Sequence, residues 1–207
     1  MIATSASSSS LLRPMLAAIA LACAAGTTRA EWAVDNAQSS LSFVSTKAGQ
    51  AGVGGVQEVQ TFKKIAGKVD NQGQISFNVD LASVDTSIGI RDERLRTMLF
   101  NVAATPTASF TARLEPGWAQ GLDTAARDID LNGQFTLAGQ TKPMAAKLRV
   151  TRVAPGRLVV STRAPVVVNA ADYGLRGGVE ALRDVMGLNF LASSAPVSFS
   201  LVLTEQR

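Results

Sequence analysis

The chain has 207 residues, a formal net charge of only +4, a single cysteine and no histidine. That charge balance does not indicate a nucleic-acid partner or a strongly charged protein partner. Because histidine is the commonest general base and the commonest metal ligand, its absence argues against a catalytic site and a metal site. We therefore expect no enzyme activity and no cofactor.

The first thirty residues have the pattern of an export signal. Met15 to Gly26 is an apolar run of about a dozen residues, too short to span a bilayer comfortably, and Arg13 precedes it. Thr28 and Ala30 are small residues at the −3 and −1 positions of a cleavage site. We predict a signal peptide over 1–30, export to the periplasm and a single domain over 31–207.

Removal of this segment changes the composition of the mature chain. The only cysteine, Cys23, is lost with it, so a disulfide within the mature chain is excluded. Eighteen basic residues remain against 16 acidic ones, because Arg13 and Arg29 are also removed. Lipid attachment at Cys23 is the weaker alternative, since Ala20 stands where a branched aliphatic residue is usual.

The first half of the mature chain alternates between apolar and polar residues. Two short strands are expected at 31–35 and 38–46, followed by a glycine-rich loop at 48–55. Alternation returns from Val56 to Val69, with an imperfection at Lys63–Lys64 that predicts a bulge or bend. The next strand carries Ile75, Phe77, Val79 and Leu81 on one face.

A short helix interrupts the strands after Asp85. Its apolar residues fall at helical spacing among arginines, and Thr86 or Ser87 is expected to cap its start. Asp92 and Arg96 stand four residues apart and are expected to pair on its polar face. Such a helix has to cover an end or a face of the structure that the strands build.

The second half returns to alternation. A long hairpin tip at 115–126 precedes a strand from Ile129 to Leu137, and further strands are expected at 144–153, 157–168 and 197–204. A second helix is expected at 177–189. About eight strands and two short helices, with turns every ten or so residues, predict an all-β sandwich or barrel.

Two features remain as candidates for function. The inward faces of the strands are apolar enough to line a barrel that holds one small ligand, or to fill it completely. Arg91, Arg94 and Arg96 stand beside apolar residues of the first helix, which would suit a lipid with an anionic head group. The alternative for these arginines is a solvated helix face.

The stretch from Ser83 to Phe110 resembles the signature segment of the YceI-like family of polyisoprenoid-binding, lipocalin-like proteins. The matching positions are Asp85, Thr86, Arg91, Asp92, Leu95, Arg96, Phe100, Pro106 and Phe110. Gly133–Met144 and Asp172–Gly174 are similar to later motifs of that family. The family often has glycine where this chain has Gln60, and histidine where it has Arg94.

The resemblance implies an eight-stranded antiparallel, lipocalin-like barrel with two short helices and an apolar tunnel. It implies a periplasmic carrier of a long isoprenoid or similar amphiphilic lipid, with no catalysis. Transient contact with a membrane and a homodimer are left open. By the parity of the strands and helices, the expected lining residues are Phe43, Phe62, Ile75, Phe77, Val79, Leu95, Met98, Leu99, Phe110, Phe135, Leu182, Met186 and Phe199.

Two other readings compete with the carrier. An outer-membrane barrel has the right strand count, but its aromatic girdles are not evident among only eight Phe, two Trp and one Tyr. An enzyme that handles quinones in the same tunnel would have to use carboxylates, lysines or Tyr173, since histidine is absent.

Overall fold

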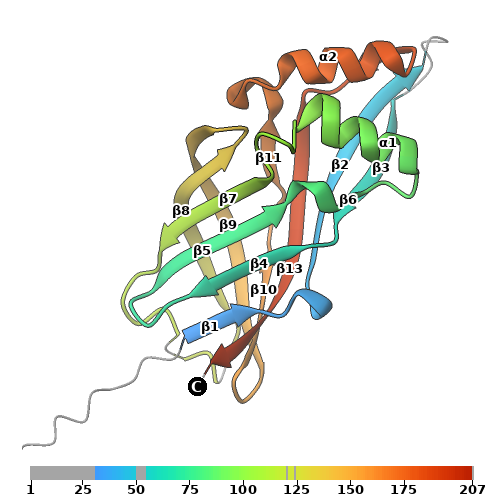
Figure 1. The fold of residues 1–207 in the computed structure, drawn as a ribbon. Helices are drawn as coiled ribbons and strands as arrows, with labels where there is room; N and C mark the ends of the chain where they lie inside the picture. The colour runs from blue at the N-terminus through green and yellow to red at the C-terminus, as the bar shows by residue number, and fades with distance from the viewer. Residues whose placement is uncertain (1–30, 50–54, 120, 124, 207) are drawn as a thin grey trace, which may run out of the picture.

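A closed ring of eight antiparallel strands forms the body of the protein (Figure 1). The computed structural model describes residues 31–49, 55–119, 121–123 and 125–206. The predicted signal peptide and most of the predicted glycine-rich loop lie outside these residues. The eight-stranded antiparallel barrel expected from the sequence is confirmed.

Each strand of the ring is hydrogen-bonded to two neighbours, and pairing of the first strand with the last closes it. In their order around the barrel, the strands are β1 (Glu31–Val34), β4 (Ile65–Val69), β5 (Gln74–Asp80), β7 (Thr107–Arg113), β8 (Arg127–Leu137), β9 (Gln140–Ala154), β10 (Arg157–Thr162) and β13 (Ser194–Gln206). Closure leaves no free sheet edge along this ring.

Five further strands extend the wall toward one end of the barrel. They are β2 (Ser40–Gly49), β3 (Val56–Phe62), β6 (Val84–Asp85), β11 (Val166–Asn169) and β12 (Leu188–Leu191). β2 follows β1 after a 3₁₀ turn at Asn36–Gln38, and β3 runs into β4 across the predicted irregularity at Lys63–Lys64. Asn36 bridges both breaks, since its side chain accepts from Ile65 N at 2.7 Å and donates to Lys63 O at 3.1 Å.

Two strand glycines allow neighbouring strands to pack closely. A Cβ on Gly133 would lie 2.4 Å from both the Phe110 ring and Thr111 O, and one on Gly67 would lie 2.9 Å from the Phe77 ring. The absence of a side chain at these positions therefore leaves room for two large rings on adjacent strands.

Two helical segments cover the same end of the barrel (Figure 1). The first is α1 (Gly89–Arg94), which continues as a π-helix over Leu95–Leu99; the second is α2 (Arg176–Val185), which follows a 3₁₀ turn at Ala170–Tyr173. No helix among the described residues is long and apolar enough to cross a membrane.

The predicted cap of α1 is wrong. Ile88 is the N-cap and makes no side-chain hydrogen bond. Asp92 is buried, and its carboxylate accepts from Thr86 N at 2.8 Å and from Thr86 Oγ1 at 2.6 Å. The expected Asp92–Arg96 pair is absent for this reason, and Arg96 instead donates to Ala82 O at 2.7 Å.

The two helical segments meet at a glycine. A Cβ on Gly178 of α2 would lie 2.7 Å from Met98 O and 3.0 Å from Leu99 Cα, whereas one on Gly177 would meet nothing within 4 Å. The backbone of α2 therefore rests directly on the π-helix at Gly178.

Candidate ligand-binding cavity

A cavity of about 310 Å³ lies inside the barrel. Its wall is almost entirely apolar, and every strand of the eight-stranded ring supplies at least one of its residues. This volume is at the lower end of the range of about 300–1,000 Å³ that is typical of small-molecule sites. The barrel is therefore hollow, and the filled-barrel alternative is excluded for the described residues.

The floor of the cavity is a tightly packed apolar cluster at the end of the barrel away from the helices. Trp32, Leu122 and Leu158 belong to this cluster and are 3%, 3% and 0% exposed. Trp118, from the hairpin tip, packs against the cluster and lines the cavity. We call Trp32, Leu122 and Leu158 the floor cluster. None of these three residues is part of the cavity wall.

Aromatic rings line the middle and the helical end of the cavity. Phe77 and Phe199 stack across the barrel, with ring centroids 6.4 Å apart. Phe62 contacts Phe43 at 5.5 Å and Phe100 at 5.9 Å between centroids. Such tilted and stacked rings provide a large apolar surface for a bound chain.

The helices form a lid on the cavity. Leu95 and Leu99 come from the π-helix, and Val179 and Leu182 come from α2. All four face the cavity, and Leu95, Val179 and Leu182 are buried. The apolar stripes of both helical segments thus serve to close the bore rather than to pack against a filled core.

Of the 13 lining residues expected from the sequence, 11 lie in the cavity wall. They are Phe43, Phe62, Ile75, Phe77, Val79, Leu95, Leu99, Phe110, Phe135, Leu182 and Phe199. Met98 and Met186 do not line the cavity but pack against the core cluster around it. Helical spacing marks the whole apolar side of a helix. It therefore did not distinguish the residues that face the cavity from those that pack beside it.

Several wall residues were not among those expected. Leu131, Leu148, Val160 and Leu201 lie on strands and face inward, and the alternation that identified their neighbours would have found them. Trp118 and Leu175 come from segments outside the strands, and no periodic pattern marks them.

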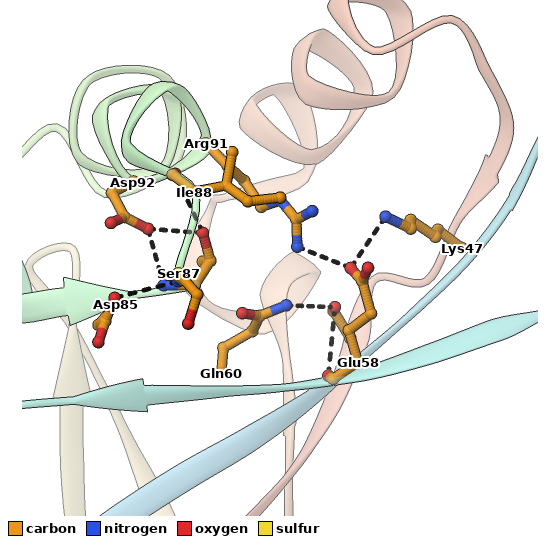
Figure 2. A network of polar contacts seen from close by, with 10 residues as sticks. Lys47, Glu58, Gln60, Asp85, Ser87, Ile88, Arg91 and Asp92 are labelled. Atoms are coloured by element: carbon orange, nitrogen blue, oxygen red, sulfur yellow. Dashed lines mark hydrogen bonds and ion pairs between the residues drawn. The ribbon is translucent and has the colours of Figure 1, made fainter.

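A network of ion pairs lies at the lid end of the barrel (Figure 2). Glu58 Oε2 contacts Lys47 Nζ at 2.9 Å and Arg91 Nη1 at 2.7 Å, so the carboxylate joins β2, β3 and α1. The hydrogen bond from Lys47 and the positive charge of Arg91 lower the pKa of Glu58 despite an opposing effect of burial. We call these three residues the Glu58 network.

The structure engages the three candidate head-group arginines in different ways. Arg91 belongs to the Glu58 network, and Arg96 donates to Ala82 O and Val84 O. Arg94 has no ion pair within the part of the chain that the structure describes. A role of these arginines toward a ligand head group remains a prediction.

Tyr173 is 4% exposed and packs edge-on against Phe135, with ring centroids 5.5 Å apart. Burial and the nearby charge of Asp172 raise the pKa of its phenol above the usual value, so it stays protonated at neutral pH. No group of three or more acidic, cysteine or histidine side chains in the described ranges is arranged to hold a metal ion.

Comparison with protein families identifies the domain. The model of the YceI-like domain matches residues 32–203. The chain belongs to the YceI-like family. A comparison with curated proteins found no significant match.

Solved structures of other proteins resemble this barrel. A polyisoprenoid-binding domain from Saccharophagus degradans is 30% identical, with a TM-score of 0.79 over 84% of this chain and 98% of that one. BcnA of Burkholderia cenocepacia is 19% identical, with a TM-score of 0.61 over 82% and 98% of the two chains. A YceI protein of Campylobacter jejuni is 16% identical, with a TM-score of 0.53 over 72% and 84%. The last two show the fold alone.

Proposed function

We propose that this YceI-like protein is exported to the periplasm after removal of residues 1–30 and carries a long isoprenoid, or a similar amphiphilic lipid, inside its barrel. The observation that carries the proposal is the apolar cavity of about 310 Å³ between the floor cluster and the helical lid. The Saccharophagus degradans relative, which is described as polyisoprenoid-binding, supports the same class of ligand.

Simple energetics favour an extended apolar chain as the ligand. Each buried CH₂ group contributes about 0.8 kcal/mol. A dozen such groups would contribute roughly 10 kcal/mol, comparable to the estimated 4–15 kcal/mol cost of association. A ligand with only a few such groups would not offset even the lower end of that cost by burial alone.

Binding inside the bore can be tested by a substitution that fills it with a larger side chain. Ala146 faces the cavity on β9, whereas its neighbour Ala145 is exposed on the outer surface. We expect Ala146→Phe to lower the affinity for geranylgeraniol, an isoprenoid alcohol used as the probe, by more than about tenfold, because the ring would occupy the space of the chain. Ala145→Phe is the matched control and should leave the affinity unchanged. Equal affinities for the two variants would exclude the bore as the site.

The natural cargo and the location need separate measurements. Protein isolated from a host that exports it should yield a long-chain lipid on organic extraction and mass spectrometry. The same protein should be released by osmotic shock and should begin at Glu31 by N-terminal sequencing. Repeated extraction without any lipid, together with failure to bind added isoprenoids, would contradict the carrier role.

A further inference from the structure

The sheet is interrupted at the lid end, between β9 and β11. The last pair that β9 makes with β10 joins Leu148 to Thr162, and β11 pairs only with β13. From Gln140 to Ala146, β9 therefore has β8 as its only strand neighbour among the described residues. Beyond the closed ring, the wall of the barrel is consequently not continuous between these two strands.

A groove follows this interruption. Residues of β9 and β11 line it, together with Pro165 before β11 and with Asp172 and Tyr173 of the 3₁₀ turn. Met144 of β9 and Val166 of β11 line both the groove and the bore. These two side chains are therefore the shared wall of the two spaces, and a ligand that passes between them would extend from the apolar bore into the groove.

Tyr173 brings an unpaired hydroxyl to the groove. The residue is 4% exposed, and it lines the groove but not the bore. Its hydroxyl makes no hydrogen bond within the part of the chain that the structure describes, yet it is not sealed from solvent. Buried polar groups are almost always paired, so this phenol, which packs against the Phe135 ring, lacks a partner that a ligand can supply.

Two further hydrogen-bond donors line the groove from separate strands. Lys142 of β9 has no ion pair among the described residues. Asn169 of β11 accepts from Ala171 N at 3.2 Å with its amide oxygen, which leaves its amide nitrogen as a donor. Asp172 is the only carboxylate in this lining, and its charge offsets that of Lys142. The groove therefore offers several donors and little net charge, which suits a head group with acceptor oxygens.

We propose that this groove is the head-group subsite of the carrier. The apolar chain of the cargo lies in the bore and passes between Met144 and Val166, and its oxygen head group lies in the groove and accepts a hydrogen bond from Tyr173. An alcohol and a phosphate share this chemistry, because the oxygens of both accept hydrogen bonds. This inference rests on the carrier function proposed above, and it gives the head group polar partners that the almost entirely apolar bore does not provide.

The test compares geranylgeraniol, geranylgeranyl phosphate and a hydrocarbon of the same chain length without oxygen. We expect Tyr173→Phe, which removes only the hydroxyl, to lower the affinity for the alcohol and the phosphate about fivefold or more and to leave the hydrocarbon unchanged. Lys142→Met should weaken the phosphate more than the alcohol, because only the phosphate is charged. Lys147→Met, at an exposed lysine of β9 outside the groove, is the matched control.

Tyr173 is the only tyrosine of the chain, which provides a direct spectroscopic readout. With an isotope label on its phenolic carbon, its NMR resonance should shift when the alcohol or the phosphate binds, and much less with the hydrocarbon. The melting temperature of ligand-free Tyr173→Phe should stay close to wild type, because the hydroxyl has no partner within the described protein. Unchanged alcohol and phosphate affinities in Tyr173→Phe, or an equal shift with the hydrocarbon, would overturn the inference. Failure of all three ligands to bind the wild type would instead overturn the carrier function itself.

Discussion

The two ends of the barrel are closed in different ways. The floor cluster closes one end with large apolar side chains, and Leu158 at its centre is fully buried. Two short helical segments close the other end, and polar contacts tie them to the strands: Asp92 to Thr86, Arg96 to backbone carbonyls, and Arg91 to Glu58. One end is therefore closed by apolar packing, and the other by helical segments that polar contacts hold in place.

This difference indicates how stability and binding are divided. Apolar packing at the floor contributes to folding whether or not a ligand is present. The lid consists of helices of six and ten residues with a π-helical turn of five between the first helix and the next strand, too short to be stable without their contacts. We therefore expect changes at the floor to act on unfolding, and changes at the lid to act on ligand entry and release.

The largest expected effect is at the floor. Leu158→Ala should lower the free energy of unfolding by about 2–5 kcal/mol, because it opens a void in a fully buried cluster. Urea denaturation measures this loss, and Val153→Ala, at a side chain that is 53% exposed, should change it by less than about 0.5 kcal/mol. The affinity of the folded variant for geranylgeraniol should stay within about twofold of the wild type. A strong loss of affinity would contradict the proposal that the floor cluster acts on unfolding and not on ligand binding.

The anchor of α1 should give the next largest effect. Asp92→Ala leaves the Thr86 amide without its acceptor in a buried position, at a cost of about 1–3 kcal/mol in unfolding free energy. We also expect faster dissociation of a bound isoprenoid in stopped-flow displacement, because the lid loosens. Glu93→Ala, at the neighbouring exposed position, is the control and should leave both quantities close to wild type. Unchanged dissociation in the Asp92 variant would argue against exit through the lid.

A pair of adjacent glycines tests the contact between the helical segments. Gly178→Ala should lower the unfolding free energy by about 1–3 kcal/mol, because its Cβ would collide with the backbone of the π-helix. Gly177→Ala meets open space within the same helix and should stabilise the protein by about 0.5–1 kcal/mol. Thermal melting of the two variants in parallel measures the difference. The same sign for both would mean that α2 does not rest on the π-helix at Gly178.

The Glu58 network should give the smallest effect, and a pH-dependent one. The pKa of Glu58 is lowered in the folded protein from an ordinary value of 4.5, so its contribution is complete above that pH and is lost as the pH falls through the lower, folded value. At pH 7 we expect Glu58→Gln to cost about 0.5–1 kcal/mol, since the side chain is 30% exposed. The difference from wild type should shrink below about pH 4.5 in urea titrations.

The matched control for that titration is Glu180→Gln, at an exposed carboxylate on α2. Its difference from wild type should stay small and should not reproduce the change seen at Glu58. A Glu58 difference that grows as the solution becomes more acidic would contradict the network.

Strand alternation carried most of what could be predicted from the sequence. A residue two positions from a buried one on the same strand faces the same side, which is why Phe77 and Val79 of β5 could both be predicted to lie in the cavity wall. The break at Lys63–Lys64 was also visible as a lapse in this period. Family resemblance, rather than periodicity, decided between a sandwich and a barrel.

Contacts between residues far apart in the sequence could not be predicted from strand alternation or helical spacing. Asp92 is a helix residue with a polar neighbour four positions later, and nothing local shows that it turns inward to bind Thr86. The pairing of Arg91 with Glu58 joins residues 33 positions apart in the sequence. Gln60 broke the apolar alternation, and only the structure shows that its amide is buried with an unpaired oxygen.

A crystal structure of the protein bound to geranylgeraniol would test the central claim most directly. The account predicts electron density for the apolar chain inside the barrel, beside the stacked rings of Phe77 and Phe199 and above Trp118, with the hydroxyl at the lid end. Density for the chain on the outer surface, or a bore filled by rotated phenylalanine rings with the ligand excluded, would contradict it.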